Sequence, residues 1–386
     1  MPTDSRRTLF RRSPGRTLAV LHPAFALTGI CHAIEGPLLP SLAPAFHLND
    51  SQAGFLLFAY FAGTSLGALL CGRHHARTLT FGFMTLAVAA ASVAFTNRGF
   101  LYPVFLLLGI CVGVPMTAVS MYAGRTFGPR SAAPLTFLNF SWSAGALFAP
   151  LLASRLLLSH TFRAAYLILA GMACLAAVAC WLQLEDSPEP EPGAGEKAGI
   201  LNLRLIVLFA VLTFLEVGVE NTTASWLATY VLRTSATGAA LAAASSSLYW
   251  CGFLASRGLS SLLLLRIYAG RLLRIATVLG ILAAAGLVLL PGTAAHILAM
   301  VVLGAALAPI FPLLLARFFA QARHSSDSRW VLSVCGFGGS VLPWLTGSIS
   351  AMTGSLRLGL IVIPAALLVI VCTLPLIGAQ RAAVNP

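Results

Sequence analysis

Residues 185–204 have the sequence EDSPEPEPGAGEKAGILNLR, which differs sharply in composition from the rest of the chain. The stretch contains five acidic residues, three prolines and three glycines, and such a composition is typical of a hydrated, flexible connection. Elsewhere the chain is apolar, because 58% of its 386 residues are hydrophobic and only 9% are charged. Soluble domains contain about 25% charged residues, so the segments on both sides of this stretch are expected to lie in a membrane.

Apolar runs of membrane-spanning length lie on both sides of the polar stretch. A spanning helix needs about 20 predominantly apolar residues, and six such runs precede residue 185 while six follow residue 204. The sequence therefore predicts an all-α polytopic membrane protein with twelve transmembrane helices in two six-helix bundles. The runs are 18–42, 52–71, 78–97, 100–124, 132–157, 164–184, 205–231, 237–263, 272–290, 294–316, 330–353 and 356–378.

These runs also predict the domain organisation and its orientation. If the spans alternate in direction, nineteen of the 24 Lys and Arg residues lie on the same side as the N-terminus and five lie on the other side. By the positive-inside rule, both termini are then cytoplasmic, in a bacterial inner membrane. The predicted parts are a basic cytoplasmic tail (1–17), an N-terminal bundle (18–184), a cytoplasmic linker (185–204), a C-terminal bundle (205–378) and a cytoplasmic tail (379–386).

The distribution of charge and the motif content exclude several functional classes. The net charge of +13 follows the predicted topology, so it indicates contact with membrane lipid and not with nucleic acid. The sequence has no GxxxxGK[ST] or HExxH motif and no metal-spaced His/Cys cluster. We therefore expect no enzymatic activity, no cofactor and no metal. The expected partner is a small-molecule solute, bound by a monomer.

Three acidic residues, Glu35, Glu216 and Glu220, are the only ones inside the apolar runs. A carboxylate in hydrocarbon is costly unless it faces a partner or a wet cavity, so these residues are expected to mark a transport path. Glu216 and Glu220 are four residues apart and share one helix face. Glu35 and Glu220 each lie about 22–26 Å along the first helix of their half, which predicts that both approach one central cavity.

His32 precedes Glu35 by three residues, so the two are expected to share a helix face. Such a pair can hold or relay a proton, which makes Glu35 and His32 candidates for proton coupling or gating. The alternatives are a structural pair that makes a buried acid tolerable, or a role in substrate binding.

Several residues form a candidate substrate-binding set. Carboxylate, amide and indole groups together suit a polyhydroxylated solute, because acceptors bind hydroxyl hydrogens and aromatic faces cover C–H surfaces. For the tryptophans, an aromatic belt at the membrane interface is the alternative explanation. The candidates are Glu216, Glu220, Asn221, Trp226, Asn139, Trp142 and Trp250.

Five short motifs resemble one branch of a known transporter family. They are Glu216-Val-Gly-Val-Glu220 with Trp226 and Tyr230, Trp250-x-Gly252 with Arg257-Gly258, Ala308-Pro-Ile-Phe-Pro312, Gly338-Gly339 with Pro343-Trp344 and Gly347, and Leu138-Asn139 with Gly145 and Pro150. Taken in their order along the chain, these motifs resemble those of the fucose–proton-symporter-like sugar transporters of the major facilitator superfamily. The resemblance implies a twelve-helix, two-bundle carrier that transports hexoses or related sugars by alternating access, often with a proton.

The chain departs from this branch at its acidic residues. The helix 1 acid of fucose permeases aligns with Gly36, next to Glu35, and the helix 4 acid aligns near Thr117. We therefore predict a secondary active or facilitative transporter of a sugar or similar small polar solute, with proton coupling left open. One alternative is an efflux carrier for amphipathic drugs or metabolites, and another is a non-transporting membrane sensor or scaffold.

Overall fold

The computed structural model describes residues 14–72, 74–127, 132–159, 161–186, 203–321 and 328–377. Most of the predicted linker and both predicted tails lie outside these ranges, and their placement stays a prediction. Two boundaries differ slightly from the predicted ones, because helix α1 begins at Pro14 and helix α8 begins at Leu203.

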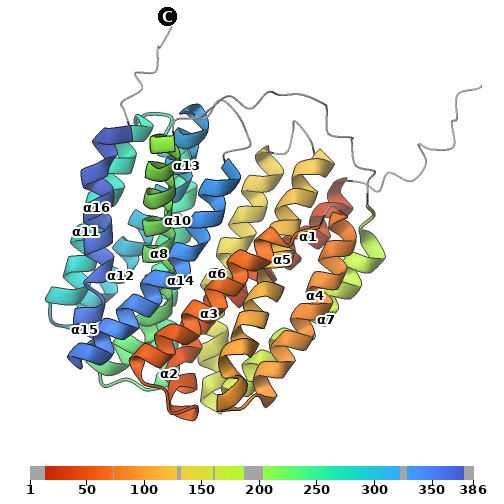
Figure 1. Ribbon diagram of the computed structural model, residues 1–386, viewed down its shortest axis with the longest axis horizontal. Coiled ribbons are helices and arrows are strands. Elements are labelled where there is room, and N and C mark those ends of the chain that lie inside the picture. The colour runs from red at the N-terminus through yellow and green to blue at the C-terminus, as the bar shows by residue number, and fades with distance from the viewer. Residues whose placement is uncertain are drawn as a thin grey trace, which may run out of the picture.

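The helices before and after the predicted linker occupy opposite sides of the molecule (Figure 1). The helices of the first half are α1 (Pro14–Ala33), α2 (Glu35–Ala45), α3 (Asp50–Leu69), α4 (His75–Phe95), η2 (Arg98–Phe100), α5 (Leu101–Phe127), α6 (Ala132–Ser159) and α7 (Phe162–Gln183). Those of the second half are α8 (Leu203–Thr234), α9 (Ala239–Ser245), α10 (Ser247–Leu263), α11 (Ala269–Leu289), α12 (Thr293–Leu307), α13 (Ile310–Gln321), α14 (Ser328–Thr353), α15 (Leu356–Gly359), α16 (Val362–Thr373) and η5 (Leu374–Ile377).

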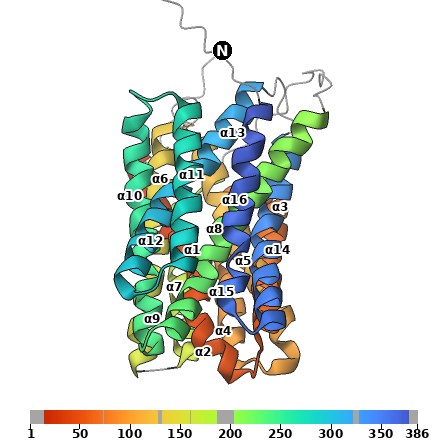
Figure 2. The ribbon, with the colours of Figure 1, turned by 90° about the vertical axis from the view of Figure 1, so that its left-hand side faces the viewer.

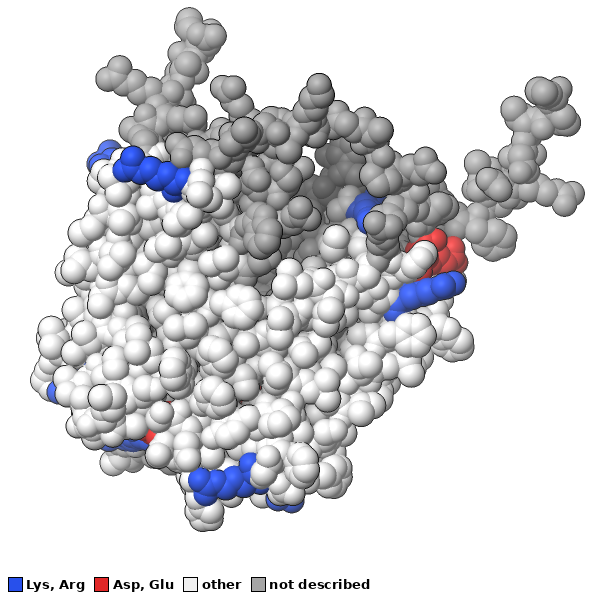
Figure 3. All heavy atoms as spheres, in the orientation of Figure 1, with Lys and Arg blue, Asp and Glu red and all other residues white. Residues whose placement is uncertain are grey.

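Helical segments of membrane-spanning length account for the predicted runs. Among the described residues, 10 helices are long and apolar enough to cross a membrane, and the bent pair α1 and α2 makes 11. Helix α14 coincides with the remaining predicted run and packs along both α8 and α3. On the face shown in Figure 3, Lys and Arg side chains lie near the two ends of the molecule, and a broad band between them is uncharged. The predicted all-α polytopic fold is confirmed.

The first predicted span is not one continuous helix. Helices α1 and α2 meet at Ile34 with a bend of 42°. Pro37 lacks a backbone N–H, and its ring clashes with the carbonyl group four residues earlier, which is that of Ala33. The expectation that His32 and Glu35 share one helix face is therefore wrong, because the helix breaks between them.

Helices α2 and α9, one from each half, are in contact at the end of the molecule opposite the start of α1 and the end of η5, which we call the opposite face (Figure 2). There, both terminal nitrogens of Arg233 in α8 donate to the Asp50 carboxylate in α3, at 2.6 and 2.7 Å. The Ser350 hydroxyl in α14 donates to the same carboxylate at 2.5 Å. We call Asp50, Arg233 and Ser350 the latch, because it joins α3 of the first half to α8 and α14 of the second.

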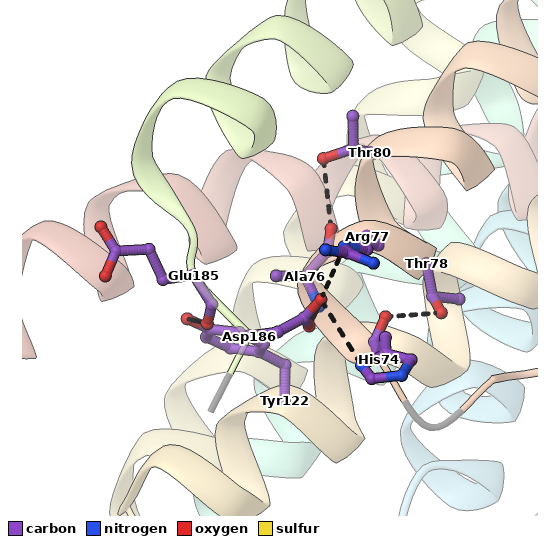
Figure 4. Close-up of polar contacts among 8 residues, drawn as sticks. All are labelled: His74, Ala76, Arg77, Thr78, Thr80, Tyr122, Glu185 and Asp186. Atoms are coloured by element: carbon purple, nitrogen blue, oxygen red, sulfur yellow. Dashed lines mark hydrogen bonds and ion pairs between the residues drawn. The ribbon is translucent and has the colours of Figure 1, made fainter. Parts of the chain in front are cut away.

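A second polar group lies at the terminal face, where α1 begins and η5 ends, and is confined to the first half (Figure 4). Asp186 follows α7, and its carboxylate accepts the backbone N–H of Ala76 at 2.7 Å in the first turn of α4. Arg77 Nε lies 3.6 Å and His74 Nδ1 3.9 Å from the same carboxylate. The Tyr122 hydroxyl of α5 donates to the Glu185 carbonyl oxygen at 3.2 Å. These bonds hold α4, α5 and α7 together as one unit.

Candidate functional site

Polar and aromatic side chains from both halves meet at the junction of α1, α6, α8 and α10. His32 Nε2 of α1 lies 3.1 Å from Asn221 Oδ1 of α8, which joins the two halves directly. The His32 ring also packs on Trp142 of α6, with ring centroids 5.3 Å apart. Trp142 in turn meets Trp250 of α10 edge to face at 6.0 Å. We call the central cluster the set of His32, Trp142, Glu216, Glu220, Asn221, Tyr249, Trp250 and Arg257.

The two acids of α8 lie in the middle of the longest described helix. Helix α8 has 32 residues, which correspond to a length of about 48 Å, and Glu216 and Glu220 lie on either side of its midpoint. Glu216 is completely buried, whereas Glu220 is partly buried. The two carboxylates interact electrostatically with each other and with the Arg257 guanidinium of α10.

Arg257 is a member of the central cluster that the predicted site residues did not include. The charge count assigns it to the cytoplasmic side, but the residue is half-buried and its guanidinium packs against aromatic rings, 4.6 Å from the ring centre of Phe253 and 5.9 Å from that of Trp142. Its NH1 donates to the Ser143 hydroxyl of α6 at 3.0 Å. The signal was present, because Arg257 lies inside the apolar run 237–263, and intramembrane bases are as informative as intramembrane acids.

Several buried polar atoms of the central cluster have no hydrogen-bond partner among the described residues. They are His32 Nδ1, Trp142 Nε1, the Tyr249 hydroxyl, Arg257 Nε and both carboxylate oxygens of Glu216. Leaving one such group unsatisfied costs about 1–3 kcal/mol. Donors, acceptors and aromatic faces therefore converge here without satisfying one another, which is the arrangement expected of a site for a hydroxyl-bearing solute.

Two other predicted substrate residues have contacts of a different kind. Trp226 is fully buried, and its Nε1 donates to the Pro343 carbonyl oxygen of α14 at 2.9 Å. Asn139 is exposed, and its side-chain amide donates to the Leu135 carbonyl oxygen of its own helix at 2.8 Å. Neither side chain lies in the ring contacts of the central cluster, and a role in substrate contact stays a prediction for both.

Glu35 lies at the first position of α2 and is 2% exposed. Its carboxylate accepts a hydrogen bond from the Tyr166 hydroxyl of α7 at 2.6 Å. Nearby, the Tyr60 hydroxyl of α3 donates to the Cys31 carbonyl oxygen at 2.7 Å, just before the break between α1 and α2. Glu35 is therefore held inside the first half, whereas His32 contacts the second half.

A bundle of apolar spanning helices in two halves, with a buried polar cluster where the halves meet, defines a polytopic membrane transporter. The family model of the Major Facilitator Superfamily matches residues 21–327. The chain belongs to this family, and the expected twelve-helix carrier class is confirmed. It is therefore an integral membrane transporter and not an enzyme.

Relatives and solved structures agree with this placement. A glucose/galactose transporter of Brucella abortus is 24% identical over 376 residues, covering 90% of each chain. The outward-facing structure of the transporter FucP has a TM-score of 0.65 at 17% identity and covers 93% of this chain and 98% of its own. A variant of the nucleoside transporter NupG has a TM-score of 0.74 at 13% identity, covering 94% and 100%. The two structures show the fold alone.

Proposed function

We propose that this protein transports a hexose or a similar polyhydroxylated solute by alternating access of the central cluster to the two faces. The observation that carries the proposal is the set of unpartnered buried atoms on His32, Trp142, Tyr249 and Arg257. Sugar hydroxyls both donate and accept, so one solute can satisfy these donors together with the carboxylates of α8. The Brucella abortus relative, a glucose/galactose transporter, supports the same class of solute.

The aromatic members of the central cluster favour a ring-shaped solute. Trp142 belongs to the first half and Trp250 to the second. A sugar packed against both indoles therefore contacts both halves at once. In this proposal Glu220 and Asn221 bind hydroxyl groups. The Asn221 side chain is then shared between the solute and His32, its partner in α1.

The orientation of the transporter in the membrane follows from the distribution of its Lys and Arg residues. We place the terminal face in the cytoplasm of a bacterium and the latch on the outer side of its inner membrane. The chain works as a monomer surrounded by lipid, because each half supplies side chains to the same site. In this orientation the contacts between Asp50, Arg233 and Ser350 close the outer side.

Binding of named sugars to the purified protein tests the proposal. We expect D-glucose or D-galactose to raise the melting temperature of the wild type, because a ligand that binds only the folded state stabilises it. Glu220→Gln should weaken that binding at least about tenfold, since hydrogen bonds to charged groups contribute roughly 1.5–3 kcal/mol. Glu185→Gln makes the same change at the terminal face and should leave binding unaltered.

Two outcomes of this binding experiment would contradict the proposal. Stabilisation by amphipathic compounds but by none of a panel of sugars would favour the efflux alternative. Sugar binding that Glu220→Gln leaves unchanged would place the solute elsewhere in the molecule. Membership in a transporter family already favours a carrier over a sensor or scaffold.

A further inference from the structure

A groove runs between α4 and α7 on the outer surface of the first half, at the edge of the molecule away from the second half (Figure 1). It consists of two adjoining hollows, which share Thr80 and Phe81 of α4 and Trp181 of α7. The hollow at the terminal face has a volume of about 540 Å³. The second hollow, of about 420 Å³, continues from it along the two helices. We call the two hollows together the α4–α7 groove.

The chemical character of the α4–α7 groove changes along its length. Charged residues line the hollow at the terminal face, namely Arg77, Glu185 and Asp186. Away from this face, the residues that line only the second hollow are all apolar, namely Met84, Cys174, Ala177 and Val178. The seven residues from Arg77 to Met84 correspond to about 10 Å along α4. A molecule with a charged head and an apolar chain therefore matches the whole groove, whereas a polar solute matches only one end of it.

The charges at the polar end favour a headgroup that carries both signs. One guanidinium, that of Arg77, and two carboxylates, those of Glu185 and Asp186, line this hollow. A headgroup with a net negative charge would add to the excess of acid, whereas a zwitterionic headgroup adds no net charge. Arg77 Nε lies 3.6 Å from Asp186 Oδ2. A phosphate beside Arg77 and a cation beside Asp186 would lie antiparallel to this ion pair and would be attracted by both of its members.

The Asp186 carboxylate further selects the kind of cation. Its Oδ1 accepts the Ala76 N–H, but no hydrogen bond from the described residues reaches its Oδ2. The two basic side chains beside Oδ2 are those of Arg77 and His74, and they are 76% and 72% exposed, so they can move aside (Figure 4). A primary ammonium has three N–H groups that can donate to this oxygen. The trimethylated ammonium of a choline headgroup has none.

We propose that the α4–α7 groove binds one phospholipid with a primary-amine headgroup, a phosphatidylethanolamine, from the leaflet at the terminal face. The ammonium donates to Asp186 Oδ2, and the phosphate accepts from Arg77. One acyl chain lies along Phe81 and Met84. The Trp181 ring, which is 70% exposed, lies where the headgroup meets the chain, as tryptophans at membrane interfaces commonly do.

The proposed lipid would stabilise one joint within the first half. Asp186 follows α7, and its carboxylate binds the first turn of α4, so a lipid that contacts Asp186 and both helices reinforces this connection. Because α4 and α7 belong to the same half, rocking of the two halves leaves the groove intact. Binding is independent of the proposed solute, since no residue of the groove belongs to the central cluster.

Competition among lipids with identical acyl chains tests the proposal. The purified full-length protein is equilibrated in mixed micelles with equal amounts of dioleoyl phosphatidylethanolamine, phosphatidylcholine and phosphatidylglycerol, and bound lipid is counted by native mass spectrometry. We expect phosphatidylethanolamine to be bound at least about fivefold over phosphatidylcholine, because a charge-assisted hydrogen bond is gained. Equal binding of the two, or a preference for anionic phosphatidylglycerol, would overturn the proposal.

Asp186→Asn tests the role of the headgroup. Asparagine keeps an oxygen that can accept the Ala76 N–H and replaces Oδ2 with an amide donor, so the connection to α4 can persist. The preference for phosphatidylethanolamine over phosphatidylcholine should then fall to about twofold or less. A preference that stays at the wild-type level would show that Asp186 does not bind the ammonium.

A second pair of variants tests the location and does not depend on the stability of Asp186→Asn. Val178→Trp fills the apolar hollow, whereas Leu175→Trp adds the same ring to another exposed position of α7 that does not line the groove. Bound phosphatidylethanolamine should decrease at least about fivefold in Val178→Trp and stay near the wild-type level in Leu175→Trp. Undiminished binding in Val178→Trp, or an equal loss in both variants, would contradict a site in the α4–α7 groove.

Discussion

Replacing Gly36 with leucine is expected to abolish solute exchange while the protein still folds and reaches the membrane. Gly36 lies in α2, and a side chain there would overlap the backbone of Ala224 and Ser225 in α8 of the other half. Overpacking a close contact costs about 1–3 kcal/mol even where side chains can shift, and here the obstacle is backbone. The opposite face could then not close fully. The rate of solute exchange should fall by about tenfold to a hundredfold.

A matched substitution separates this effect from a general loss of stability. Gly171 lies in the middle of α7, where an added side chain meets open space, so Gly171→Leu should exchange solute at nearly the wild-type rate. Size-exclusion profiles and the thermal stability of both variants should be similar. Full exchange by Gly36→Leu would show that the contact between α2 and α8 need not close during transport.

Replacing Arg257 with methionine is expected to be the most destabilising change in the central cluster. Methionine keeps much of the side-chain volume but leaves Glu216 and Glu220 without their cation. Removing one partner of a buried charge group costs roughly 3–5 kcal/mol. The melting temperature and the yield of folded protein should both fall, and scanning fluorimetry after purification measures the difference.

Rescue identifies the cause of that loss. In the double variant Arg257→Met with Glu216→Gln, one unpaired charge is removed, and much of the lost stability should return. Arg271→Met changes an exposed arginine near the start of α11 and serves as the control. If the double variant is no more stable than Arg257→Met alone, the guanidinium stabilises the cluster through its packing on Phe253 and not through charge.

The helices could be predicted from the sequence because a membrane imposes one simple requirement on them. Each predicted run coincides with one helix or with consecutive helices, and their order along the chain follows directly. The bend at Ile34 had a local signal in Pro37, but its position and its angle of 42° depend on how α2 packs against α8. Spacing alone therefore placed His32 and Glu35 on one face, and the structure separates them.

The site was predictable in its residue types and not in its pairings. The acids of α8 were noticed because carboxylates are rare in apolar runs, and two other candidates, Trp142 and Trp250, contact each other in the structure. The bond between His32 and Asn221 joins residues 189 positions apart, and that between Glu35 and Tyr166 joins residues 131 apart. Such contacts arise from helix packing, for which one sequence carries no local pattern. Arg257 was overlooked because its charge was counted toward topology.

The most direct test of the account is sugar counterflow in proteoliposomes that contain only the purified wild-type protein. Vesicles loaded with unlabelled D-glucose or D-galactose are diluted into a trace of the labelled sugar, with no ion gradient present. A carrier whose site opens alternately to the two faces should accumulate the label transiently above its equilibrium level, and Gly36→Leu should not. If the wild type binds the sugar but shows no transient accumulation, alternating access through the central cluster is contradicted.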